Sequence, residues 1–266
     1  METQESGRDQ GNMAEKKKAY YKISTLEKGL EVIELLAREK HLSVTEVARH
    51  LGQNRSASHR FLATLHELGY VLKDEQSRYR LSLKFFEIAN RIDDIDQVRT
   101  TARPFMRELS ATHGETVNLG RIEGDDVVTI DTIPGTEVIK FESRIGERSP
   151  AHSLGMGKSI LSFRSPEEQE AYMDRAEFVK LTDKTITSKA KFRKELERVK
   201  SRGYAIDDEE WSVGLRCVSI PVFNHVRPSY AISVSGPASR MTPEKVDLVK
   251  GDLLLISQTL AKKLQS

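Results

Sequence analysis

The chain has 266 residues, 31% of them charged, and a formal net charge of +2 at pH 7. This length allows two domains with ample cores, and the near balance of charge means that any nucleic-acid binding must come from where the cations lie rather than from their number. The single cysteine excludes an intrachain disulfide and fits a reducing cytoplasm. No apolar run approaches the ~20 residues of a membrane span, so we expect no membrane partner.

The first residues of the chain, 1–20, are polar and contain the cluster Lys16-Lys17-Lys18. This composition predicts a disordered basic arm. Ser24 and Glu27 have the spacing of a capping box, which predicts that a helix begins there. The apolar positions of this helix that we expect to face a core are Leu26, Leu30, Ile33 and Leu36.

Residues 43–81 have the pattern of two short helices followed by a two-stranded hairpin. Ser43 and Glu46 form a second capping-box pattern, and Gly52 suits a tight turn between the helices. Asn54 or Ser56 can cap the second helix. Its expected buried positions, spaced i, i+4 and i+7, are Phe61, Leu65 and Leu68. Together these signals predict a winged helix-turn-helix domain over residues 21–82.

The other side of the second helix is short, polar and cationic toward the helix start. A recognition helix that enters a DNA major groove needs such a side, and the hairpin adds arginines that can lie along phosphates. The alternative is an ordinary solvated face of a helical hairpin. The residues that we predict to contact double-stranded DNA are Thr45, Asn54, Arg55, Ser56, His59, Arg60, Arg78 and Arg80.

Residues 83–97 are expected to form a linker helix, and residues 98–266 a second domain for effector binding and oligomerisation. Short strands are predicted at 116–120, 127–131, 138–142, 204–207, 215–223 and 230–235. Helices are predicted near 156–164, 166–176 and 188–202 and from Pro243 onward. The alternation indicates an α/β domain with a mainly antiparallel sheet, and the whole chain an α+β two-domain protein.

Gly157-Lys158-Ser159 resembles the end of a phosphate-binding P-loop. That motif needs a glycine five positions before Gly157, where His152 stands, so nucleotide hydrolysis is rejected. A glycine-containing loop that opens a helix still exposes free backbone amides, which favour a carboxylate. A tight helix entry without a ligand is the plainer alternative.

Cys217, His152 and Asp207 invite a nucleophile, base and orienter interpretation. Nothing in the sequence brings the three together, and a cysteine within an apolar strand is more often inert packing. Ser233 and Ser235 lie on one face of a strand, with Val234 on the other. If that face is inward, the two hydroxyls lie beside Cys217 in a polar pocket that Trp211 could cover. The seven histidines show no metal-ligand spacing, so neither a metal nor a cofactor is predicted.

Over residues 22–266 the sequence resembles the IclR family of bacterial transcription regulators. The motifs that carry the resemblance are Leu26-Glu-Lys-Gly-Leu30, Arg60-Phe-Leu-Ala-Thr-Leu65, Leu68-Gly-Tyr-Val71, Tyr79-Arg-Leu81, Gly155-Met-Gly-Lys158, Gly214-Leu-Arg-Cys217 and Pro221-Val222. The resemblance implies a winged helix-turn-helix joined to a GAF-like effector domain, acting as a homodimer or dimer of dimers on a palindromic operator. Residues 185–188 and 209–224 are most similar to the branch that senses sugar acids such as 2-keto-3-deoxygluconate.

By resemblance, five positions match those that line the effector pocket of the family: Gly155, Met156, Asp207, Leu215 and Cys217. With Ser233 and Ser235 they form the predicted effector site. The expected function is a repressor released from its operator by a small carboxylate, a sugar acid or 2-keto acid, with no catalytic residue. The alternatives are an activator of the same family that responds to an aromatic acid, a Cys217-dependent enzyme, and an oligomerising architectural protein without a ligand.

Overall fold

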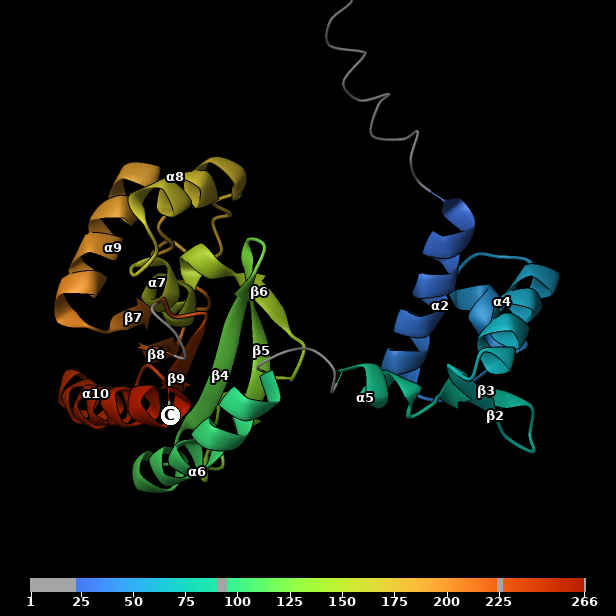
Figure 1. Cartoon of the computed structure of the whole chain (residues 1–266), viewed down its shortest axis with the longest axis horizontal. Helices are drawn as coiled ribbons and strands as arrows, with labels where there is room; N and C mark the ends of the chain where they lie inside the picture. Colours follow the sequence, from blue (N-terminus) through green and yellow to red (C-terminus); the bar gives the residue numbers. More distant parts are fainter. Residues whose placement is uncertain (1–22, 90–94, 224–226, 266) are drawn as a thin grey trace, which may run out of the picture. The chain divides into compact units, whose positions relative to one another are not determined.

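The computed structural model of the chain describes residues 23–89, 95–223 and 227–265. The chain divides into two units, Met1–Ile92 and Asp93–Ser266 (Figure 1). The predicted basic arm, residues 1–20, lies outside the described residues.

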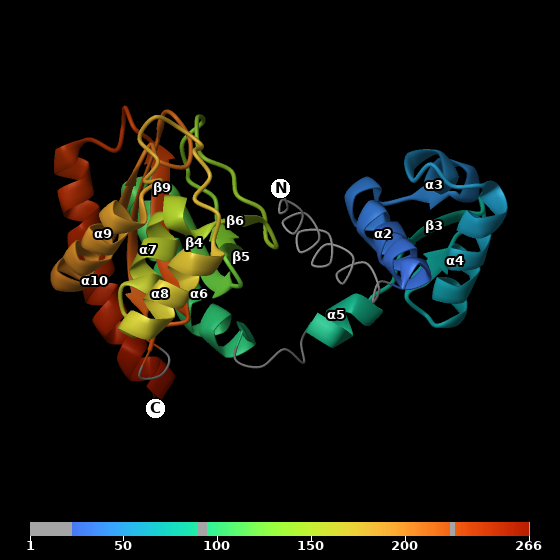
Figure 2. The same ribbon diagram turned by 90° about the horizontal axis from the view of Figure 1, so that it is seen from above.

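The first unit is built from four helices and a small sheet in its described part. Its elements are α2 (Ser24–Glu39), β1 (Leu42–Ser43), α3 (Val44–His50), α4 (Arg55–Glu67), β2 (Val71–Lys73), β3 (Arg78–Leu81) and α5 (Lys84–Ala89). Strands β1 and β2 both pair antiparallel with β3, which gives a three-stranded sheet in the order β1-β3-β2. Helices α2, α3 and α4 lie beside this sheet (Figure 2). This is the predicted winged helix-turn-helix.

Side-chain caps fix the starts of the two helices that form the helix-turn-helix. The Ser43 hydroxyl accepts a hydrogen bond from the Glu46 amide at 3.3 Å, and the Glu46 carboxylate accepts one from the Ser43 amide at 2.7 Å, so the predicted capping box is present. Asn54, rather than Ser56, caps α4 by accepting from the Ala57 amide. The capping box expected at Ser24 is wrong, because Ser24 is already the first residue of α2 and the N-cap residue is Ile23, which provides no side-chain cap.

The buried faces of α2 and α4 differ in phase from the prediction. In α2 the buried residues are Val32, Leu35 and Leu36, which all lie in its C-terminal half, while Leu26 and Leu30 are exposed. In α4, Ser58 and Leu62 are fully buried one turn apart. The phase of α4 is therefore set by Leu62, which leaves Phe61 and Leu65 at the edge of the core and Leu68 exposed as the C-cap residue.

The second unit contains a six-stranded sheet and five α-helices in its described part. Its elements are α6 (Ile95–His113), β4 (Thr116–Glu123), β5 (Asp126–Ile133), β6 (Arg148–Pro150), the 3-10 turn η1 (Ala151–Ser153), α7 (Gly155–Leu161), α8 (Pro166–Arg175), α9 (Lys189–Arg202), β7 (Ala205–Asp208), β8 (Leu215–Val222), β9 (Tyr230–Pro237) and α10 (Pro243–Gln265). The strand order is β6-β5-β4-β9-β8-β7, and every neighbouring pair is antiparallel, as predicted.

Helices cover both faces of this sheet and divide the unit into three layers (Figure 1). Alternate residues of the central strands, such as Val218 and Val234, face α6 and α10 and form the larger core. The opposite face of the sheet lies against α7, α8 and α9, whose apolar core includes Ile160, Met173 and Phe192. On this face, strands β4, β8 and β9 also carry a row of polar side chains that faces the pocket described below.

Two predicted segments, residues 138–142 and residues 83–97, differ from the structure. Residues 138–142 do not form a strand: Val138 and Ile139 are exposed, and β6 already occupies the free edge of β5. The expected linker, residues 83–97, contains the whole of α5 (Lys84–Ala89) and the start of α6, which begins at Ile95. Residues 90–94 lie outside the described residues, so the exact division into domains stays a prediction.

Candidate DNA-binding face and ligand pocket

The N-terminal half of α4 presents the polar side expected of a recognition helix. Arg55, Ser56, His59 and Arg60 are exposed on this helix, and Thr45 is exposed in the first turn of α3. The exposure follows from the burial of Ser58 and Leu62, which turns the neighbouring positions outward. These side chains are free to meet base edges or phosphates.

Arg78 and Asn54 are less available than predicted. The Arg78 guanidinium donates to the His41 carbonyl at 2.9 Å and to Glu46 at 3.2 Å. These bonds connect the wing, which is the hairpin of β2 and β3, to the start of α3. The pKa of Glu46 is lowered to about 2, chiefly by the hydrogen bond from the Ser43 amide. The Asn54 side-chain oxygen is occupied as the helix cap. Arg80, on the same strand as Arg78, is exposed.

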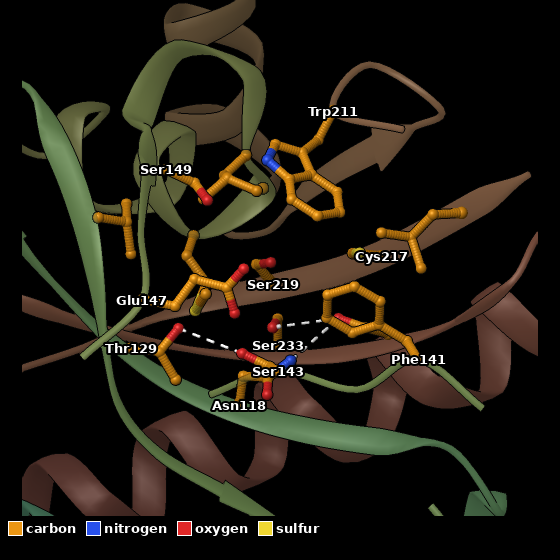
Figure 3. Close-up of a pocket in the computed structure, with 16 residues that line it drawn as sticks. Asn118, Thr129, Phe141, Ser143, Glu147, Ser149, Trp211, Cys217, Ser219 and Ser233 are labelled. Atoms are coloured by element: carbon orange, nitrogen blue, oxygen red, sulfur yellow. Dashed lines mark hydrogen bonds between the residues drawn. The ribbon is translucent and has the colours of Figure 1, made fainter. Parts of the chain in front are cut away.

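A pocket in the second unit lies between the sheet and the start of α7 (Figure 3). The empty space between its lining residues, counted together with the open solvent at its mouth, is about 460 Å³. The residues lining it are Asn118, Val127, Thr129, Phe141, Ser143, Glu147, Ser149, Leu154, Gly155, Met156, Trp211, Leu215, Cys217, Ser219, Ser233 and Ser235. Six of the seven residues of the predicted effector site are therefore neighbours.

Strand alternation accounts for the polar floor of this pocket. In β9, Ser233 and Ser235 face the pocket while Val234 faces the opposite core, as predicted. The register places Asn118 of β4 opposite Ser233, and the Asn118 amide lies 3.4 Å from the Ser235 hydroxyl. Cys217 and Ser219 continue the same row on β8.

Two aromatic rings close the other side of the pocket. Phe141 and Trp211 meet edge to face, with centroids 5.6 Å apart (Figure 3). Phe141 comes from the segment that was predicted as a strand, and Trp211 from the turn between β7 and β8. The rings offer an apolar surface that can pack on a ring or on the C–H face of a sugar-like ligand.

Asp207 is the predicted site residue that does not line the pocket. It is fully buried, and one carboxylate oxygen accepts hydrogen bonds from the backbone amides of Glu210 at 2.8 Å and Trp211 at 3.3 Å. Burial raises the pKa of Asp207 to about 7. Asp207 therefore shapes the turn that carries Trp211 rather than the surface of the pocket.

The described contacts do not assemble a catalytic triad. His152 is buried, its ring lies against Phe178, and its Nε2 lies 3.1 Å from the Val179 carbonyl oxygen. Burial raises the pKa of the Cys217 thiol well above its usual range, which disfavours the thiolate that a nucleophile needs. Among the described residues no group of three or more His, Cys, Asp or Glu side chains is placed to hold a metal ion.

Sequence reasoning missed several lining residues. Ser219 could have been found, since it lies on the same strand face as Cys217, whereas Asn118 reaches the pocket through the pairing of β4 with β9. Phe141, Ser143, Glu147 and Ser149 lie outside regular strands or in the short β6 and carried no periodic signal.

The described helices include none long and apolar enough to cross a membrane.

Comparisons with known proteins agree on both units. The sequence pattern described as "Bacterial transcriptional regulator IclR C-terminal" matches residues 92–262, and "IclR helix-turn-helix domain" matches residues 25–75. The HTH-type transcriptional regulator KdgR of Escherichia coli (strain K12) is 32% identical over 247 residues, covering 92% of each chain. KdgR of Dickeya chrysanthemi is 35% identical over 225 residues, covering 84% of this chain and 73% of that one. The crystal structure of the Thermotoga maritima IclR superposes with a TM-score of 0.78 at 30% identity, covering 92% of this chain and all of that one.

Proposed function

The chain belongs to the IclR family and is a DNA-binding transcription regulator, not an enzyme; from this premise we propose that it is a repressor that loses affinity for its operator when it binds a small hydroxylated carboxylic acid. The effector binds in the pocket between Cys217, Ser235 and Trp211 of the second unit. Two or four copies of the chain bind one operator together.

The observation that carries the ligand class is the polarity of the pocket. Hydroxyl and amide groups of Asn118, Ser219, Ser233 and Ser235 line its floor, and Phe141 with Trp211 provides an apolar wall. Such a lining fits a ligand that has several hydroxyl groups and a C–H face, as a sugar acid does.

The ligand carboxylate has one suitable place. Glu147 is the one ionisable carboxyl among the lining residues, and no lysine or arginine is among them. An anion is therefore expected to avoid Glu147 and to take the backbone amides at the start of α7, where Gly155 and Met156 line the pocket. A dicarboxylate would meet Glu147 and is expected to bind more weakly.

A second candidate is an activator that responds to an aromatic acid. The observation in its favour is the edge-to-face pair of Phe141 and Trp211, which can pack on an aromatic ring. Seven hydroxyl or amide side chains, those of Asn118, Thr129, Ser143, Ser149, Ser219, Ser233 and Ser235, are more than a single ring hydroxyl would use, and this favours the sugar acid.

The test uses a labelled duplex that carries the promoter of the protein's own gene. We expect binding that weakens steeply between about 50 and 200 mM salt, as phosphate contacts do. A panel of sugar acids, 2-keto acids and aromatic acids is then added. A sugar acid should release the DNA and raise the unfolding temperature of the protein.

Ser235→Ala should lower the effector sensitivity without changing the affinity for DNA, and Ser201→Ala, on the exposed side of α9, is the matched control. Absence of salt-sensitive promoter binding would overturn the DNA-binding role. Promoter binding that no acid in the panel changes would overturn the effector proposal alone.

A further inference from the structure

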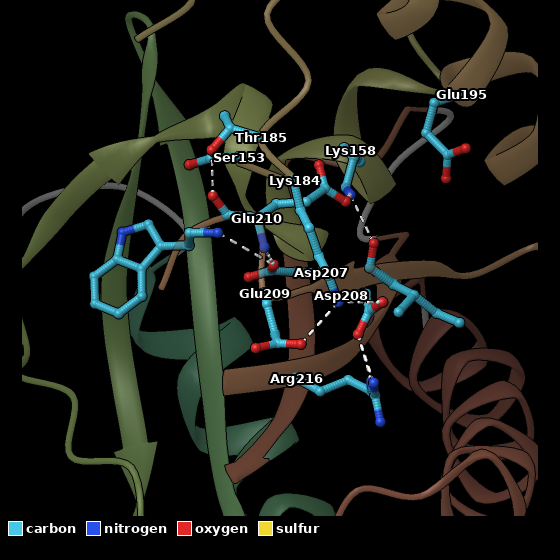
Figure 4. A network of polar contacts seen from close by, with 12 residues as sticks. Ser153, Lys158, Lys184, Thr185, Glu195, Asp207, Asp208, Glu209, Glu210 and Arg216 are labelled. Carbon is cyan, nitrogen blue, oxygen red and sulfur yellow. Dashed lines mark hydrogen bonds and ion pairs between the residues drawn. The ribbon is translucent and has the colours of Figure 1, made fainter. Parts of the chain in front are cut away.

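Three ionisable side chains lie buried together behind the pocket. Lys158 of α7 is fully buried, and its ammonium donates to the Ile206 carbonyl at 2.6 Å and forms an ion pair with Glu210 (Figure 4). Asp207, which lies between Ile206 and Glu210 in the sequence, is fully buried, and Glu210 is almost fully buried. Neither a DNA contact nor the lining of the pocket requires a lysine here.

Lys158 joins the two walls of the pocket. Met156, two residues before Lys158 on α7, lines one wall, and Trp211, the residue after Glu210, lines the other. Asp207 completes the link, because one of its carboxylate oxygens accepts from the Glu210 and Trp211 amides.

The turn of residues 207–211 is held from its outer side as well. The hydroxyl of Thr185 donates to the Glu210 carbonyl at 2.6 Å, and that of Thr182 donates to the Glu209 carbonyl at 2.7 Å. Farther out, the exposed Lys184 bridges Asp208 and Glu209 (Figure 4). The turn thus carries one buried lysine contact and one exposed lysine contact.

We propose that Lys158 is a positioning residue: through Ile206 and Glu210 it holds Trp211 over the pocket and so governs how readily an effector enters and leaves. This inference rests on the proposed effector pocket and adds to it the residue that controls access. The buried pair of Lys158 and Glu210 sets the position of the turn rather than the stability of the fold, since apolar residues can replace such pairs without loss of stability.

The unsatisfied atoms of this cluster support a positioning role. One carboxylate oxygen of Glu210 and one of Asp207 are buried, and no hydrogen bond within the described residues reaches them. A buried acceptor without a partner leaves the cluster dependent on the contacts that it does make. The Lys158 ammonium contacts the Ile206 carbonyl and Glu210, so the loss of Lys158 leaves the turn without its anchor on α7.

The chain has its own reporters for this test. Trp211 is the one tryptophan and Cys217 the one cysteine of the sequence, and both line the pocket. Quenching of Trp211 fluorescence by acrylamide measures exposure of the ring, and alkylation of Cys217 by iodoacetamide measures opening of the pocket. Neither measurement needs an effector or DNA.

Lys158→Met keeps the bulk of the side chain and removes the ammonium. We expect it to speed the alkylation of Cys217 by roughly tenfold or more and to increase the quenching of Trp211, because local opening controls the reaction of a buried group. Lys184→Met is the matched control on the outer side of the same turn. Its exposed ion pairs contribute little, so both readouts should stay within about twofold of the wild type.

Lys158→Met leaves Glu210 unpaired and can destabilise the whole fold, so a second variant, Lys158→Met with Glu210→Leu, is needed. It removes both charges and is expected to melt near the wild-type temperature. Fast alkylation and strong quenching in this stable variant would support the positioning role. Wild-type alkylation and quenching in it, or an equal effect of Lys184→Met, would overturn that role while leaving promoter binding and effector release untouched.

Discussion

Two arginines of the first unit differ in what holds them. Arg60 is exposed on α4, and no hydrogen bond or ion pair within the described residues engages its guanidinium. Arg78 is held by the His41 carbonyl and by Glu46. The two side chains should therefore contribute to different properties of the protein.

Arg60→Ala should weaken promoter binding by about 1–3 kcal/mol, the usual effect of losing one arginine contact to DNA, and leave the melting temperature unchanged. Arg78→Ala should lower the melting temperature because the wing loses its tie to α3. Fluorescence anisotropy with labelled promoter and thermal unfolding measure the two effects. Arg60→Ala that binds promoter as the wild type does would remove this residue from the interface.

Asp207 should make stability depend on pH. Burial, the largest influence, raises its pKa from 3.8 to about 7, although Lys158 opposes the rise, while Glu210 adds to it and Cys217 lies opposite on β8. Between these two pH values the folded chain holds a proton that the unfolded chain has lost. The contribution of Asp207 to stability is therefore present below pH 3.8 and is lost as the pH rises through about 7.

Asp207→Asn removes this titration but keeps an oxygen that can accept from the Glu210 and Trp211 amides. Relative to the wild type, the variant should gain about 1.4 kcal/mol of stability for each pH unit from pH 5 to about pH 7, and no more above that pH. Urea unfolding followed through Trp211 fluorescence measures the difference. A constant difference across this pH range would show that Asp207 is ionised throughout.

At the scale of the element, α3 depends on its cap. The Ser43 hydroxyl accepts from the Glu46 amide, and the Glu46 carboxylate in turn holds Arg78 of the wing. Ser43→Ala should destabilise the protein by about 1 kcal/mol, the usual effect of losing such a cap. Ser56→Ala, an exposed serine in the first turn of α4, is the control and should change thermal unfolding little. Equal melting temperatures for the two variants would contradict the role of the cap.

Helices α2 and α4 show why local sequence patterns predict where a helix lies better than they predict which of its faces is buried. The heptad-like spacing in α2 and α4 predicted the helices correctly, but several leucines fit the stripe equally well. Which of them is buried depends on the elements packed against the helix. Val32 and Leu62 meet the common core of the first unit, and Leu26, Leu30 and Leu68 do not.

At the scale of the whole molecule, each unit has a hydrophobic core of its own. Val32, Val47 and Leu62 belong to the core of the first unit, and Val218 and Leu253 to that of the second. A recognition helix on one unit and a pocket in the other are the two parts that a regulated DNA-binding protein needs. In the proposed function each copy supplies one recognition helix, so we expect a specific site to combine at least two copies.

The operator should therefore have two halves related by a two-fold axis, with centres about 34–36 Å apart or a multiple of that distance. Footprinting on the promoter should show two such halves, and titration should give two or four chains for each site. An isolated half-site should bind far more weakly. One chain bound to one asymmetric site would contradict this arrangement.

The sequence by itself determined the winged helix-turn-helix, the antiparallel sheet and the shared face of Ser233 and Ser235, because caps, turns and strand alternation are local and repeat at fixed spacing. Only the tertiary structure decided which further residues surround the pocket and that Asp207 does not. Phe141 reaches it from a segment without strand pairing, and Asp207 turns away from it to hold the Trp211 turn. The burial of Lys158 was equally hidden, because whether a charge is buried depends on partners such as Glu210 that lie far along the chain.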